Sequence, residues 1–380
     1  MMHQSNNNNT ECSPSHQSRL IERIRALDRS AELSQRYTPL VLFHPTTTGN
    51  QSDKSTASVD HRSSSYVTVG HVETKLLPML LECNNEDDKS VFVMKKIPNR
   101  HGTSTDALTL NHGGDWRIDN TTQLFQHRTL AFEHVTNHLI SSGVISRKHA
   151  DMYPIYSFCN KDSDVSGGDE KEILAHINRN TAPYLGMDSV GVHLHCYVCE
   201  RDLDEKKAFI KGVWLAQRAA NKSHHPGFWD PTVAGGQPVN LSILDNIIKE
   251  AYEEAGVPAE WCDVSNNSQD TNFTDNTHDP LTITTAKSDG SCMKRSIYYS
   301  CDLQVPYDWT PTPIDGEVAQ FKLYSMKELE EELRFGNSLR PAMRALLVDF
   351  MIRHGTLEGE EGENIEEFRD ALRRERLNLL

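Results

Sequence analysis

The chain of 380 residues carries a formal net charge of −15, and 37% of its residues are hydrophobic. This length allows two domains of about 100 to 200 residues each, with enough apolar side chains to bury a core. The negative charge argues against non-specific binding to nucleic acid or to an anionic membrane, and no run of about 18 apolar residues predicts a transmembrane helix.

The beginning of the chain and its cysteines indicate a compartment. Residues 1–16 are rich in Asn and Ser, with neither a basic start nor an apolar stretch, so they predict a disordered tail rather than a secretory signal. The eight cysteines have no regular spacing, which favours a reducing environment over a disulfide framework. We therefore expect a cytoplasmic protein, with organellar targeting left open.

Residues 17–175 predict a small α+β domain in which we find no catalytic constellation. Apolar residues at helical spacing alternate with stretches of strand-like residues, separated by polar breaks. The expected elements are a short amphipathic helix within 17–37, a loop at 46–65, strands at 66–72 and 91–97, a strand and turn at 108–119, a helix at 128–142 and the start of another helix within 145–152.

A polar, glycine-containing segment at 159–172 predicts the loop before a second domain, residues 176–356, which is followed by a tail at 357–380. Strands are expected on both sides of a glycine-rich loop and a helix, which indicates an α/β sandwich. The expected elements are strands at 190–199, 212–218, 296–303 and 318–324, a mobile polar insertion at 265–291, a capping box at 325–328, a helix at 339–354 and a peripheral helix in the tail.

The second domain contains a loop and helix with clear start and stop signals. Gly235–Gly236 opens the loop, Asn240 or Ser242 can cap the helix, a carboxylate stands three residues after Ser242, and Gly256 ends the helix. An apolar stripe at three- and four-residue spacing predicts the buried face. This stripe consists of Leu244, Ile247, Ile248, Ala251, Tyr252 and Ala255.

Three carboxylates, Glu250, Glu253 and Glu254, crowd the end of this helix. Like charges at that spacing repel, so the cluster is either a solvated acidic face or a site for a hard divalent cation such as Mg²⁺ or Mn²⁺. The two preceding glycines favour the second interpretation, because they let the backbone approach a ligand closely.

This spacing resembles the Nudix box, which reads Gly, five residues, Glu, seven residues, Arg-Glu, an aliphatic residue, any residue, Glu-Glu, any residue, Gly and an aliphatic residue. Leu241 stands where the first Glu is usual and Lys249 where the Arg is usual. The resemblance implies an α/β/α sandwich and a metal held by the three carboxylates. The matching positions are Gly235, Lys249, Glu250, Ala251, Glu253, Glu254, Gly256 and Val257.

The segments around the box are similar to a narrower Nudix branch, called thiamine pyrophosphokinase-related, which carries an N-terminal DUF4743-type domain. This resemblance implies a pyrophosphatase that removes the terminal phosphate from thiamine diphosphate or its damaged oxy- and oxo-forms and leaves the monophosphate. The residues that carry it are 191–197, 213–218, Lys222, 226–227, 229–230, 234–236, Pro313, 315–318 and Phe321.

Outside the helix we single out a small set of site residues. Glu317 is a candidate proton acceptor, because the preceding Asp-Gly turn could bring it to the metal, or it is simply exposed. Arg218 and Lys222 could contact phosphate, or they are surface charges. Trp229 could stack on a substrate ring, although buried tryptophans more often belong to a core.

Two histidines and two cysteines on one predicted strand offer other chemistry. His193 and His195 share a face and could line the pocket, although we expect at least one to be packed. Cys196 and Cys199 have the spacing of a zinc half-site, but the residues should point to opposite faces of the strand and no second pair is present. We therefore favour structural roles for the cysteines.

The sequence leaves three functions in competition. The first is the thiamine diphosphate hydrolase, and the second is a Nudix hydrolase of a nucleoside diphosphate derivative such as ADP-ribose or a nucleotide sugar. The third is a catalytically silent Nudix binding module. A kinase is disfavoured because the sequence has no Walker-type loop. The expected partner is a small-molecule diphosphate, not nucleic acid or a membrane, and the sequence does not determine the oligomeric state.

Overall fold

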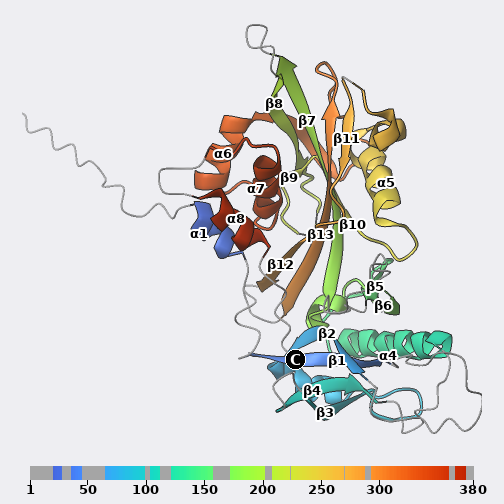
Figure 1. Ribbon diagram of the computed structural model, residues 1–380. Coiled ribbons are helices and arrows are strands. Elements are labelled where there is room, and N and C mark those ends of the chain that lie inside the picture. Colours follow the sequence, from blue (N-terminus) through green and yellow to red (C-terminus); the bar gives the residue numbers. More distant parts are fainter. Residues whose placement is uncertain are drawn as a thin grey trace, which may run out of the picture.

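A four-stranded sheet, an eight-stranded sheet, a two-stranded sheet and the helices packed on them make up the described part of the computed structural model of the protein (Figure 1). The structure describes residues 20–27, 36–44, 65–98, 103–111, 121–156, 172–201, 208–222, 224–268, 270–286, 292–358 and 364–373. The predicted tail at 1–16 and nearly all of the predicted loops at 46–65 and 159–172 lie outside these residues.

The N-terminal domain is a four-stranded sheet in the order β2-β1-β4-β3, followed by a long helix and a β5–β6 hairpin. The strands predicted at 66–72 and 91–97 and the helix at 128–142 are present. The helix expected to start within 145–152 is absent, because this stretch turns and leads into β5, which pairs with β6. The elements are β1 (Tyr37–His44), β2 (Ser65–Glu73), α3 (Leu77–Leu81), β3 (Phe92–Pro98), β4 (Ser104–Leu110), α4 (Thr121–Ser141), β5 (Met152–Tyr156), β6 (Ile173–Asn178) and the short 3-10 helices η2 (Thr74–Leu76) and η3 (Ala182–Leu185).

The core of this N-terminal domain continues beyond residue 175. Leu174, Ile177, Leu185 and Met187 are buried in the same hydrophobic cluster as the residues of its four-stranded sheet and of α4. A boundary at 175 would cut β6 in two, so the second domain begins at about residue 188, where the long strand β7 starts.

The C-terminal domain is built on an eight-stranded mixed sheet with the central order β11-β13-β7-β8-β14. Helix α5 covers one face, and α6, α7 and α8 cover the other (Figure 1). This layering confirms the predicted α/β/α sandwich behind a smaller domain. The elements are β7 (Asp188–Arg201), β8 (Ala208–Arg218), β9 (Trp229–Pro231), β10 (Val233–Gly236), α5 (Ile243–Ala255), η4 (Ala259–Cys262), η5 (Val264–Asn266), β11 (Asn272–Asp275), β12 (Leu281–Ala286), β13 (Met293–Val305), β14 (Val318–Ser325), α6 (Met326–Phe335), α7 (Met343–Arg353) and α8 (Ile365–Leu372).

Strand β7 separates two hydrophobic cores because its side chains alternate between the faces of the sheet. Val192, Leu194 and Cys196 are buried in the core under α5, whereas Tyr197 and Cys199 pack in the core under α7. The two cysteines therefore point to opposite faces, as predicted, and both are free thiols.

The polar insertion at 265–291 contains two strands where we expected a mobile loop. Strands β11 and β12 both pair antiparallel with β13. Three apolar side chains among the polar residues, Phe273, Leu281 and Ile283, are buried and fix these strands to the sheet. Residues 287–291 lie outside the described residues.

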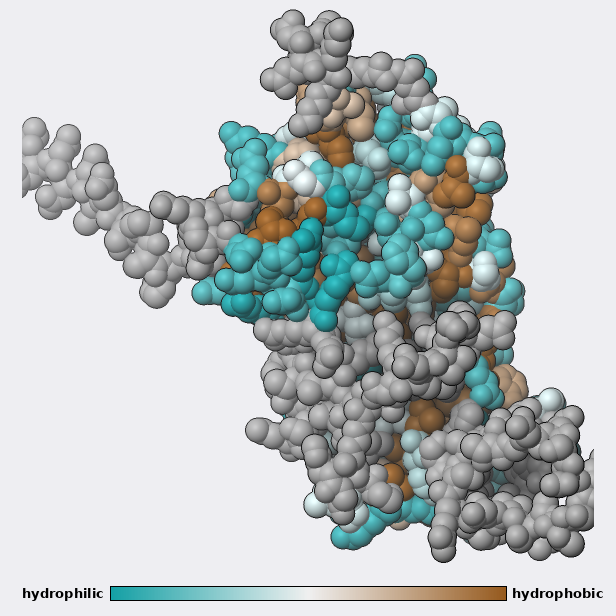
Figure 2. All heavy atoms as spheres, in the orientation of Figure 1, coloured by the Kyte–Doolittle hydropathy of each residue, from teal (hydrophilic) through white to brown (hydrophobic). Residues whose placement is uncertain are grey.

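The first and last helices of the structure lie side by side on the C-terminal domain. Helix α1 (Leu20–Arg25), which we had placed in the N-terminal domain, buries Leu20 and Ile24 in the same core as Phe368 of α8. Arg23 adds hydrogen bonds to the backbone carbonyls of Arg334 and Gly336. Hydrophilic side chains cover the solvent side of these helices (Figure 2).

The helices of the described residues give no membrane span, because none of them combines the length and the apolar character that crossing would need.

The burial of α8 predicts that the C-terminal segment stabilises the whole domain. Phe368 is 0% exposed, so Phe368→Ala should lower the free energy of unfolding by about 3–5 kcal/mol through lost apolar contacts and a cavity. The matched control is Phe335→Ala in α6, where the side chain is 53% exposed and the loss should be well below about 1 kcal/mol. Urea denaturation of both variants measures the difference, and equal losses would contradict the placement of α8.

Candidate active site

Helix α5 forms where the sequence places it, and its ends are fixed locally. The Ser242 hydroxyl oxygen accepts a hydrogen bond from the Asp245 backbone N–H at 3.1 Å, and Gly256 ends the helix with a φ of +69°. Ile247 and Ala251 are buried as the stripe predicts. Tyr252, which we assigned to the same stripe, is 59% exposed, because the core under α5 does not extend to its side of the helix.

Glu254 is the buried carboxylate of the site. Its Oε2 accepts a hydrogen bond of 2.8 Å from the backbone N–H of Ala234 in β10, which joins the helix to the strand. Burial raises the pKa of Glu254 to about 8. The charges of Glu250, Asp315 and Asp230 act in the same direction, so four carboxyl groups share this part of the molecule.

Gly235 is required by the neighbouring Glu250. A Cβ atom at position 235 would lie 2.5 Å from Glu250 Cγ, so only glycine lets β10 pass this close to α5. Gly235 and Gly236 form the end of β10, and the loop follows them, whereas the sequence predicted that they open the loop. Burial raises the pKa of Glu250, against the opposing effect of Lys249.

Lys249 stands where the Nudix box usually has Arg, and it binds two of the predicted metal ligands. Its Nζ lies 2.6 Å from Glu253 Oε2 and 3.2 Å from Glu250 Oε1. Glu253 is half exposed and turned toward this lysine. A cation that recruits Glu253 would therefore have to compete with the ammonium group.

The turn before β14 adds two carboxylates. Asp315 and Glu317 each offer an oxygen that lies, together with one of Glu254, within 4.8 Å of the others. Asp315 Oδ1 also accepts the Glu317 backbone N–H at 2.8 Å, which fixes the turn. Sequence reasoning treated Asp315 only as a turn residue, although its position two residues before Glu317 was the available signal. An all-oxygen set of this kind suits Mg²⁺ or Mn²⁺.

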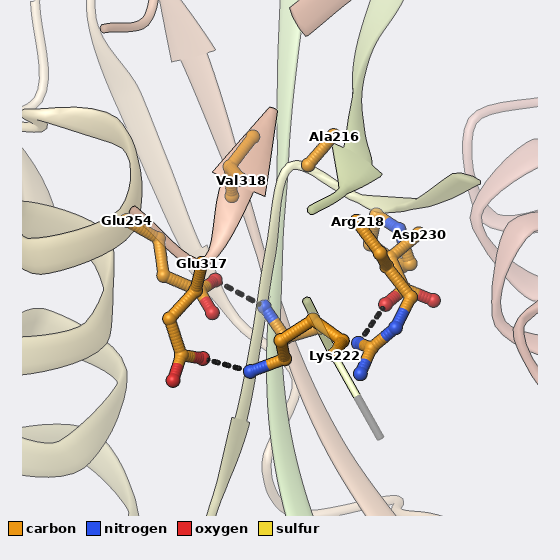
Figure 3. Close-up of a pocket in the computed structure, with 9 residues that line it drawn as sticks. Ala216, Arg218, Lys222, Asp230, Glu254, Glu317 and Val318 are labelled. Atoms are coloured by element: carbon orange, nitrogen blue, oxygen red, sulfur yellow. Dashed lines mark hydrogen bonds and ion pairs between the residues drawn. The ribbon is translucent and has the colours of Figure 1, made fainter. Parts of the chain in front are cut away.

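Cations face these carboxylates across a groove (Figure 3). Lys222 pairs with Glu317, and Arg218 Nη1 lies 2.8 Å from Asp230 Oδ2. Arg340, which sequence reasoning missed, holds the other oxygen of Asp230 at 2.5 Å. The groove is lined by Ala216, Arg218, Lys222, Asp230, Pro231, Ala234, Glu254, Glu317 and Val318.

The predicted aromatic and histidine contributors lie mainly in the cores. Trp229 is buried and packs edge-on against Tyr324, with ring centroids 5.6 Å apart. His195 is buried on Asp302, with 3.0 Å between Nδ1 and Oδ1. His193 is also buried, edge-on to Tyr298. None of these three rings lines the groove described above.

Residues 197–346 match the NUDIX domain family, and this stretch contains every carboxylate of the site. This part of the chain resembles a Nudix domain. The match runs from β7 into α7 and agrees with the superfamily that the box predicts.

Three relatives resemble a longer part of the chain. "Nudix hydrolase 24, chloroplastic" of Arabidopsis thaliana is 28% identical over 249 residues, which are 66% of this chain and 60% of that protein. "Nudix hydrolase 20, chloroplastic" of the same plant is 29% identical over 235 residues, 62% of this chain and 55% of that protein. "Uncharacterized protein YJR142W" of Saccharomyces cerevisiae is 25% identical over 287 residues, 74% of this chain and 79% of that protein. The chain thus spans less than two thirds of the length of the two plant relatives.

The buried carboxyl group of the Nudix domain predicts a pH dependence of stability. Between about pH 4.5 and about pH 8 the folded protein holds a proton on Glu254 that the unfolded chain releases. The free energy of unfolding of metal-free protein should therefore fall as pH rises through this window, by up to about 1.4 kcal/mol per pH unit.

The control for this dependence is Glu254→Gln, which keeps the shape of the side chain but cannot titrate. The difference between wild type and variant, measured by urea denaturation in EDTA from pH 5 to pH 8, isolates the contribution of Glu254. Parallel stability profiles would show that Glu254 titrates normally in the folded protein.

Proposed function

We propose that this protein is a metal-dependent diphosphate hydrolase. The observation that carries the proposal is a single groove lined by the carboxylates of Glu254 and Glu317, with Asp315 beside them, and by the cations Lys222 and Arg218. Carboxylates without a cation would repel a diphosphate, whereas carboxylates that hold Mg²⁺ or Mn²⁺ beside fixed cations would attract it.

The metal ligands we propose are Glu250, Glu253 and Glu254, with Asp315 and Glu317 as further oxygen donors. When bound, the divalent cation would neutralise the negative charge that develops on the phosphate oxygens. The raised pKa of Glu254 fits this role, because the proton it holds in the metal-free protein is one that a cation can replace.

The reaction we propose is attack of water on the terminal phosphorus. The bond between that phosphorus and the bridging oxygen breaks, inorganic phosphate leaves, and the monophosphate remains. Glu317 is the proposed proton acceptor for the water, because its side chain is half exposed beside the buried Glu254. Arg218 and Lys222 would orient the phosphates.

The remaining predicted site residues would act by shaping the groove. Gly235 and Gly236 keep the strand free of side chains next to the metal ligands. Trp229 was predicted to stack on substrate. Since it is buried on Tyr324, we propose that it instead holds its neighbour Asp230, and through it Arg218 and Arg340, in place.

Within this reaction class we propose thiamine diphosphate or its oxidised analogues as substrate. The support is the similarity of the segments around the box to the thiamine pyrophosphokinase-related branch. A nucleoside diphosphate derivative such as ADP-ribose is the second candidate, because the box residues contact only phosphates and would serve either substrate. We place the reaction in the cytoplasm; the names of the two plant relatives make an organelle the alternative.

The proposal predicts magnesium-dependent hydrolysis, either phosphate release from oxythiamine diphosphate or thiamine diphosphate, or cleavage of ADP-ribose to AMP and ribose 5-phosphate. Glu254→Gln should lower the turnover by about 100-fold or more, since a neutral amide cannot replace the carboxylate as a metal ligand. Glu253→Gln tests the exposed ligand in the same way. Initial rates, with magnesium and with EDTA, provide the measurement: phosphate is followed for the thiamine compounds and AMP for ADP-ribose.

The matched control is Glu260→Gln, which changes an exposed glutamate just beyond α5 and should leave the rate unchanged. Melting curves verify that each variant is folded. Equal rates for wild type and Glu254→Gln would overturn the metal assignment, and hydrolysis of ADP-ribose alone would discard the thiamine substrate. Absence of hydrolysis of all three compounds would favour the silent binding module.

A further inference from the structure

Beside the active-site groove lies a strip of β10 and β7 with almost no side chains, which we call the floor. Ala234 lines the groove, and Gly236 projects to the same side of β10 because it lies two residues further on. In the register of β10 with β7, Gly236 stands opposite Gly191. A Cβ atom on Gly191 would lie 3.1 Å from the Tyr298 ring, so the absence of a side chain at position 191 leaves room for this ring.

The N-terminal domain forms a wall at the far end of this floor. Tyr153 Oη and Arg179 Nη1 lie 3.4 Å and 3.6 Å from the position of a Cβ on Gly236. The Arg179 guanidinium lies over the Tyr153 ring, 5.6 Å from its centroid. Both residues belong to the β5–β6 hairpin and its end, which Figure 1 shows next to the lower ends of β7 and β10.

Arg179 keeps donors available at this position. Its Nη1 binds Asp151 at 3.1 Å, and its side chain is 41% exposed. A guanidinium has five N–H donors, so one ion pair leaves several of them for a ligand. The phenol and the guanidinium together offer hydrogen-bond donors beside an aromatic ring.

Several cations lie around this position. Arg218 and Arg340 both bind the carboxylate of Asp230. Lys294 of β13 lies near enough to Arg340 and Arg179 to be repelled by both, and within the described ranges it forms no ion pair. The buried Nδ1 of His193, which faces the same floor, also lacks a hydrogen-bond partner among the described residues.

The length of the floor decides which part of a substrate would reach this wall. Two residues of a strand span roughly 7 Å, so a phosphate beside Glu254 and Ala234 is too far from Gly236 to contact Arg179 directly. The end of the groove at Arg179 would therefore receive the group that is attached to the diphosphate.

We propose that Arg179 and Tyr153 of the N-terminal domain complete the substrate site of the Nudix domain and bind the organic half of the substrate. This inference rests on the proposed function. The group they select is a planar ring that carries hydrogen-bond acceptors, because the wall presents donors on an aromatic surface. The N-terminal domain is accordingly a specificity element of the enzyme.

The test compares ligands that contain or lack the organic half and that the enzyme does not consume. Titration calorimetry with magnesium measures binding of thiamine monophosphate, AMP and methylene diphosphonate to the full chain. Arg179→Gln should lower the affinity for the monophosphate that wild type binds by about tenfold or more, and Tyr153→Phe should lower it by about threefold to tenfold. The affinity for methylene diphosphonate should change less than about twofold in both variants.

Arg147→Gln is the matched control, since Arg147 is an exposed arginine of the same domain. The Arg147→Gln variant should bind all three ligands with the affinities of wild type. Arg179→Lys keeps the charge but loses the planar donors, so partial recovery of affinity is expected. The inference would be overturned if Arg179→Gln and Arg147→Gln bound the monophosphate with equal affinity, or if Arg179→Gln lost as much affinity for methylene diphosphonate as for the monophosphate. It would also be overturned if wild type bound neither monophosphate.

These outcomes separate the inference from the proposed function. Selective loss of monophosphate binding in Arg179→Gln, in a protein that hydrolyses none of the three diphosphates, would support the role of Arg179 and reject the hydrolase. Magnesium-dependent hydrolysis of one of them, with unchanged monophosphate affinity in Arg179→Gln, would support the hydrolase and reject the role of Arg179.

Discussion

The hydrogen bond between the Ala234 backbone and the Glu254 carboxylate fixes the geometry on which the site depends. It joins the end of α5 to β10 through a carboxylate that is 5% exposed. Because the carboxylate is buried, its charge is costly unless a proton or a cation compensates it. The close approach that this bond requires is possible only because Gly235 leaves room for Glu250. One strand-to-helix contact thus places two carboxylates and holds the glycine floor beside them.

A second buried carboxylate, Asp230, organises the opposite side of the groove. It binds Arg218 from β8 and Arg340 from the segment before α7, so it couples the sheet to the helices of the far layer. Asp302 does the same deeper in the domain, where His195 and His354 bind its two oxygens. Burial would raise the pKa of Asp302, but these hydrogen bonds and neighbouring charge hold it well below its usual range. Such pairs specify how the layers meet, because an unpaired buried charge is strongly unfavourable.

Some elements of the chain pack against the domain to which they do not belong in sequence. Helix α1 precedes the N-terminal domain in sequence but completes the core under α7 together with α8. The β5–β6 hairpin belongs to the N-terminal core, yet Tyr156 packs against the core under α5 and Tyr153 reaches the glycine floor. Helices α1 and α8 therefore complete one layer of the C-terminal domain, and the intervening domain lies beside the end of β10. This position is the basis of the substrate role that we propose for the N-terminal domain.

The sequence by itself determined the elements whose signals are local. The cap at Ser242, the end of α5 at Gly256 and the alternation of β7 depend on neighbours a few residues away, so spacing was sufficient to predict them. The Glu cluster, for which we propose metal binding, was visible for the same reason. Tertiary structure alone decided that 265–291 joins the sheet, that α1 packs on α8, and that Tyr252 faces solvent. It also brought Asp315 to Glu254, Arg340 to Asp230 and Arg179 to Gly236, each from a distant segment. Burial and proximity of this kind arise from packing between elements. A periodic pattern within one element predicts which of its faces is apolar, but it does not predict which other element packs on that face.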